Sequence, residues 1–194
     1  MKKAKKALAI LLCAALLVGG TIAGTVAYLT AKTDPVTNTF TAGNVAITLD
    51  EEKLGTTTGE RTTTGNTYHL IPGETYKKDP TVHVAANSED SWIFVKVENG
   101  LAGYEVTGDG SIEAQILAKG WTKLEAGVYY KEYEKQDSVK DLVVFETFTI
   151  NSNQVLGDTW SKVKDAKVIV TAYAVQQSGV ANVTTAWNTV KDMQ

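Results

Sequence analysis

The feature that most restricts the fold is a series of short runs rich in Thr, Val, Tyr and Trp, each about as long as one strand. Residues of these types fit a pleated, half-buried surface. Gly, Asn and Asp fill most of the gaps between the runs, as is typical of turns. The sequence therefore predicts an all-β fold, with strands at 44–49, 81–85, 91–98, 104–107, 128–133, 142–150 and 167–175.

Two of these runs indicate how a core would form. Within 91–98, Ile93, Val95 and Val97 share one face, because successive strand side chains point to opposite sides. In 167–175, apolar side chains occupy both faces, which favours a strand that is covered on both sides. We therefore expect 167–175 to lie in the middle of a sheet.

Two short helices and one long polar loop complete the predicted elements. Residues 111–117 and 182–190 each place apolar side chains four positions apart, and Asn182 is a favourable N-cap. Residues 55–67 (GTTTGERTTTGNT) contain almost nothing apolar, so we expect a surface loop or hairpin tip there.

The N-terminus has the composition of a secretory signal peptide. Four lysines lie within the first six residues, and an apolar run follows over 7–18. This run is shorter than the roughly 20 residues that cross a bilayer. Small residues before and at Ala27 predict cleavage there, so that the mature chain begins at Tyr28. The alternative is an uncleaved membrane anchor. We predict a signal peptide at 1–27 and a secreted or cell-surface mature domain at 28–194. After cleavage, the mature domain should have no stable membrane anchor.

The composition of the mature chain limits its chemistry. Its 167 residues suffice for one domain. The only cysteine, Cys13, lies in the signal, which leaves the mature domain without disulfides or a thiol nucleophile. Loss of the four signal lysines changes the formal net charge from −3 to −7, which argues against nucleic acid as a partner.

No catalytic motif is visible in the sequence. His69 and His83 are the only histidines, and neither belongs to an H-E-x-x-H zinc motif. A G-x-S-x-G nucleophile elbow is also missing. The carboxylates at 50–52 and 89–90 are expected in solvated turns, with a calcium site or a glycosidase-like pair as the alternative. We therefore predict no catalytic, cofactor-binding or metal-binding residues.

Several segments together resemble a known family. They are 26–30 (VAYLT), 38–45 (NTFTAGNV), 72–84 (PGETYKKDPTVHV), 170–176 (VTAYAVQ) and 186–187 (AW). In this order, behind a lysine-rich signal, they are similar to the camelysin and TasA group of exported Gram-positive proteins. The resemblance implies a signal cut by a SipW-like signal peptidase and a single-domain, jelly-roll-like β-sandwich.

The resemblance implies two different functions. TasA-like members are subunits of extracellular biofilm-matrix fibres, whereas the camelysin label implies a cell-surface metalloprotease. The missing zinc motif favours the structural subunit, which self-associates into fibres. A monomeric adhesin or carbohydrate-binding module is a third alternative, in which Trp121, Tyr129 and Trp187 would be exposed; such aromatic residues are more often part of a core.

The segment 28–43 is a candidate assembly strand. It is polar and contains a proline, yet Val36, Phe40 and the following Val45 offer apolar side chains that could fill pockets along an exposed sheet edge of a neighbouring subunit. The alternative is that this segment pairs as the first edge strand of its own domain.

Overall fold

The computed structural model describes residues 44–56, 59–153, 163 and 165–193. They belong to one compact unit, Ala42–Gln194. Its strands are β1 (Ile47–Glu52), β2 (Arg61–Thr62), β3 (Thr75–Lys77), β4 (Thr81–Val84), β5 (Ser91–Asn99), β6 (Thr122–Glu125), β7 (Val128–Tyr133), β8 (Lys140–Val143), β9 (Thr147–Thr149) and β10 (Val168–Gln176). The helices are the short 3-10 turn η1 (Gly108–Gly110), α2 (Ile112–Ala118) and α4 (Val183–Val190).

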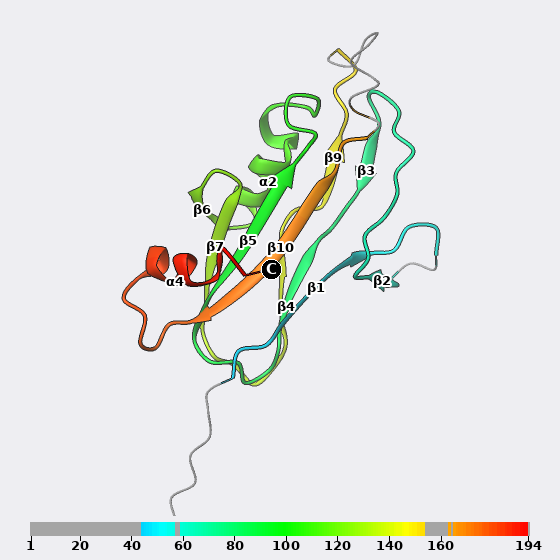
Figure 1. The fold of residues 1–194 in the computed structure, drawn as a ribbon. Helices are drawn as coiled ribbons and strands as arrows, with labels where there is room; N and C mark the ends of the chain where they lie inside the picture. Colours follow the sequence, from blue (N-terminus) through cyan, green and yellow to red (C-terminus); the bar gives the residue numbers. More distant parts are fainter. Residues whose placement is uncertain (1–43, 57–58, 154–162, 164, 194) are drawn as a thin grey trace, which may run out of the picture. The chain divides into compact units, whose positions relative to one another are not determined.

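The strands form antiparallel sheets. One has the order β2-β1-β4-β8, a second has the order β10-β5-β7-β6, and β3 pairs with β9. Figure 1 shows β5 between β10 and β7. The prediction of a fold built mainly from strands, with two short helices, is confirmed.

Apolar side chains of both four-stranded sheets meet in one core. Alternation along the strands explains this, because β4 turns Val82 and Val84 inward while His83 between them points to the other face. The fully buried residues of this core also include Ile93, Val95, Ile116, Val144, Phe145 and Ile150.

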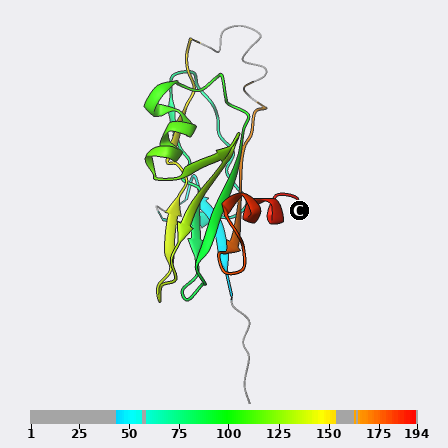
Figure 2. The ribbon, with the colours of Figure 1, turned by 90° about the vertical axis from the view of Figure 1, so that its left-hand side faces the viewer.

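A second cluster covers the opposite face of β5. Phe94 is fully buried there and lies 5.5 Å from Trp187 of α4, measured between ring centres. Trp187 also makes an edge-to-face contact with Tyr173 of β10. Figure 2 shows α4 on the side of the sheet away from α2. The core therefore covers one face of β5, and α4 covers the part of the other face around Phe94.

Both helices begin where the sequence predicts. Ser111 caps α2 by accepting a hydrogen bond from the backbone N–H of Ala114. Asn182 caps α4 in the same way through the N–H of Thr185. Each cap satisfies a backbone donor that the first helical turn leaves free.

The expected central position of 167–175 is wrong. The strand exists as β10, but among the described residues it pairs only with β5 and lies at the edge of its sheet. Its apolar residues on two faces have a different cause: one face packs on the main core, and the other contributes Tyr173 and Val175 to the cluster under α4. An edge strand can thus carry apolar residues on two faces, because α4 covers Tyr173 and Val175.

Other strand boundaries also differ from expectation. The run 142–150 is split between β8 and β9, because the consecutive residues Val144 and Phe145 are both buried and interrupt the alternation. Residues 104–107 form only one bridge, between Glu105 and Ile150. The short strands β3 and β6 were not predicted, and β2 lies inside the expected loop 55–67.

Candidate assembly surface

The outer edge of β10, with which no described strand pairs, is the clearest candidate for a binding surface. The backbone N–H of Gln177 donates to Asp90 O at 2.8 Å, and that of Gly100 donates to Lys167 O at 2.8 Å. In an antiparallel pair, hydrogen-bonded and non-hydrogen-bonded positions alternate. The odd-numbered residues of β10 therefore bond to β5, and the even-numbered residues 168–176 direct their N–H and C=O groups away from it.

The same even-numbered residues direct their side chains toward the main core. Val168, Val170, Ala172 and Ala174 are half-buried and pack against it. Within the described ranges, no strand pairs with the outer edge of β10. A strand that paired with this edge would meet outward-directed backbone groups and the apolar margin of the core.

Two hollows adjoin this edge. They measure about 260 and 580 Å³ and share Lys78, Val168 and Ile169 in their walls. Leu49 of β1 lines the smaller hollow, and Phe148 of β9 lines the larger one. Because the side chain of Ile169 is 45% exposed, the margin of β10 presents an apolar group to solvent beside these hollows.

The structure places one of the predicted assembly residues. Val45 is half-buried and lies two residues before the start of β1. Val36 and Phe40 lie outside the described residues, as do Ala27 and Tyr28 at the predicted cleavage site. Pairing of the 28–43 segment, in its own subunit or in another, therefore remains a prediction.

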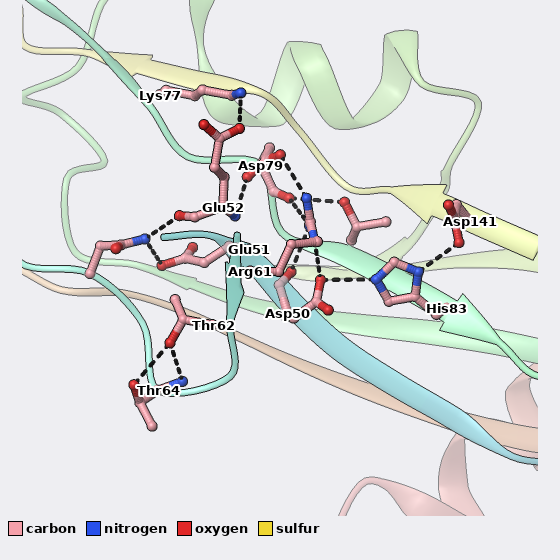
Figure 3. A network of polar contacts seen from close by, with 12 residues as sticks. Asp50, Glu51, Glu52, Arg61, Thr62, Thr64, Lys77, Asp79, His83 and Asp141 are labelled. Atoms are coloured by element: carbon pink, nitrogen blue, oxygen red, sulfur yellow. Dashed lines mark hydrogen bonds and ion pairs between the residues drawn. The ribbon is translucent and has the colours of Figure 1, made fainter. Parts of the chain in front are cut away.

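A network of charged side chains covers the outer face of the sheet that contains β1 (Figure 3). His83 lies between two carboxylates, with Nε2 2.9 Å from Asp50 Oδ1 and Nδ1 2.6 Å from Asp141 Oδ1. Arg61 joins Asp50 to Asp79 through contacts of 2.5 and 3.1 Å. The pairing of β1, β4 and β8 brings these groups together, since His83 is opposite Thr48 on one side and Asp141 on the other.

The network changes the protonation of its members. Burial by itself lowers the pKa of His83, but hydrogen bonds to Asp50 and Asp141 outweigh this and raise it above the usual value. For Asp50, burial acts in the raising direction, whereas His83 and Arg61 lower its pKa overall. Only a protonated imidazole can donate from both nitrogens, so the geometry fits a charged His83 between two carboxylates.

The expectation that 50–52 forms a solvated turn is wrong. Asp50, Glu51 and Glu52 belong to β1, and Glu51 is only 5% exposed. A charge can be buried there because Lys78 and Asn66 both donate hydrogen bonds to its carboxylate. Residues 50–52 are three consecutive acids without apolar alternation, so the sequence pattern does not predict that they belong to a strand.

Residues considered for other chemistry do not come together in a site. His69 is exposed, and both nitrogens of His83 contact aspartates. Within 44–56, 59–153 and 165–193, no three His, Cys, Asp or Glu residues are arranged to hold a metal ion. Trp121, Tyr129 and Trp187 are 2–4% exposed, which confirms their expected place in the core. No helix in the described part of the chain is long and apolar enough to span a membrane.

Comparison of the chain with protein-family models, curated proteins and solved structures finds no match. The family resemblance therefore rests on the sequence segments alone.

Proposed function

We propose that this chain is an exported structural protein, a TasA-like subunit of extracellular biofilm-matrix fibres of a Gram-positive cell. Its two four-stranded sheets around one core form a jelly-roll-like β-sandwich in this proposal. A SipW-like signal peptidase removes 1–27 during export. The observation that supports assembly most strongly is the unpaired outer edge of β10 among the described residues.

Fibres then grow by β-strand addition. Residues 33–41 of one subunit equal β10 in length, at nine residues, and align along the edge of β10 in the next subunit. The even-numbered backbone groups of β10 supply the hydrogen bonds, while Val36 and Phe40 supply the apolar groups that set the register. The hollows beside Ile169 provide space for such side chains.

Electron microscopy of two purified chains tests this function. The mature protein beginning at Tyr28 should form filaments, whereas a chain beginning at Asn44 should remain folded by circular dichroism and stay dispersed. Equal filament formation by both chains, or dispersed particles for both, would refute assembly through 28–43. Unfolding of the shorter chain would instead assign this segment to its own domain.

A further inference from the structure

A single buried carboxylate at the end of β1 binds both an amine and a carboxamide. Lys78 Nζ donates to Glu51 Oε2, and Asn66 Nδ2 donates to Glu51 Oε1 at 2.9 Å. The side chains of Lys78 and Glu51 are 11% and 6% exposed, respectively. These three groups are a nucleophile, an acyl group and an acid–base group, which together are the components of an amide-transfer reaction.

The carboxamide of Asn66 is held in one orientation. Its nitrogen also donates to the backbone carbonyl of Glu52 at 2.7 Å, and its oxygen accepts a hydrogen bond from the backbone N–H of Leu54 at 2.9 Å. A backbone N–H in this position polarises the carbonyl and stabilises an oxyanion that forms on it. The nitrogen that would leave therefore faces Glu51, and the oxygen that would gain charge faces a donor.

The side chains of Glu51 and Lys78 are largely buried, although both line the smaller hollow. Tyr68 lies nearby, and burial raises the pKa of its hydroxyl, with the negative charge of Glu51 adding to the effect. The contact between Lys78 Nζ and Glu51 Oε2 gives a proton of the ammonium group a direct path to the carboxylate. The neutral amine that results is the form that attacks a carbonyl carbon.

We propose that Lys78 and Asn66 become joined by an intramolecular isopeptide bond. Glu51 takes a proton from Lys78, and Nζ attacks the side-chain carbonyl carbon (Cγ) of Asn66. The oxyanion is stabilised by the N–H of Leu54. Glu51 then returns that proton to the carboxamide nitrogen, the C–Nδ2 bond breaks, and the leaving ammonia takes up the surplus proton of Nζ as an ammonium ion. One amide and one ammonium group are consumed, and one amide and one ammonium ion are formed, so that no oxidant or further reactant is needed.

This bond would link the segment after β2 to the segment between β3 and β4, beside the smaller hollow at the edge of β10. It forms within one subunit, and it does not depend on the proposed fibre assembly. Its presence can be measured on a monomer, so a failure of one proposal leaves the other open to its own test.

Intact-mass spectrometry of the purified, denatured mature protein tests the proposal. The wild type should be lighter than its sequence by one ammonia, and Lys78→Arg and Glu51→Gln should have their full sequence masses. A succinimide at an asparagine loses the same mass, so peptide mapping must also find a branched peptide that joins Lys78 to Asn66.

Asn66→Asp provides a matched variant, because attack on its carboxyl group releases water and yields the same linked product. A variant with the mass of the linked wild type would support the chemistry. Folded wild type with its full sequence mass, or a mass deficit that persists in Lys78→Arg, would overturn the proposal. Circular dichroism of each variant separates loss of the bond from loss of the fold.

Discussion

The alternating hydrogen bonds of β10 predict opposite effects for proline at two adjacent positions. Proline removes a backbone N–H and is tolerated on edge strands where that N–H faces outward. Thr171 is an odd-numbered position opposite Lys96, so its N–H donates to β5. Ala172 is an even-numbered position, and its N–H points to the outer edge of β10, away from β5.

The expected sizes follow from the hydrogen bonds. Thr171→Pro leaves a carbonyl of β5 without its donor, which should lower the free energy of unfolding by at least about 1–3 kcal/mol. Ala172→Pro breaks no bond to β5, so its monomer should be more stable than that of Thr171→Pro. It removes one donor to an added strand, which should weaken subunit association roughly 5- to 100-fold.

Chemical denaturation monitored by circular dichroism measures the first effect, and the critical concentration for filament formation measures the second. Ala172→Val is the control, because it also adds two carbons but keeps the N–H. Filament growth by folded Ala172→Pro at the wild-type critical concentration would refute strand addition at β10. Equal stability of both proline variants would refute the assigned alternation.

Three further predictions concern other parts of the chain. The fold raises the pKa of His83, so protonated His83 stabilises the fold fully below about pH 6.5, and this stabilisation is lost as the pH rises through the higher folded pKa. Denaturation measured across this pH range should show the free energy of unfolding fall by about 1 kcal/mol. The fall should be absent in His83→Gln. Trp187→Ala should cost about 3–5 kcal/mol in a urea titration, since the ring is 4% exposed and donates to Glu125; a cost below about 1 kcal/mol would contradict docking of α4. N-terminal sequencing of the secreted product should begin at Tyr28, and a full-length membrane-bound product would contradict export with cleavage.

Local sequence patterns predicted the elements whose signals are local. The apolar alternation of β5 identified a strand, and the apolar spacing in 111–117 and 182–190, with Asn182 as a cap, identified the two helices. The alternation did not predict sheet order, because Tyr173 and Val175 of β10 are covered by α4 and not by another strand. The tertiary fold decides which distant segments pair, and the apolar periodicity within one strand does not contain this information.

The polar groups were harder to predict for a related reason. Asp50, His83 and Asp141 are far apart in the sequence and meet only through the register of three strands. Glu51 looked solvated, because an acid among acids is typical of turns. Its burial depends on Lys78 and Asn66, which approach from later segments.

Residue-resolved amide hydrogen exchange on the edge of β10 tests strand addition most directly. The chain beginning at Asn44 should be measured alone and with a peptide covering 28–43. The even-numbered amides from Val168 to Gln176 should exchange quickly in the free chain and become protected when the peptide binds, while the odd-numbered amides are protected in both states. Unchanged exchange at the even-numbered positions under saturating peptide would contradict strand addition at β10.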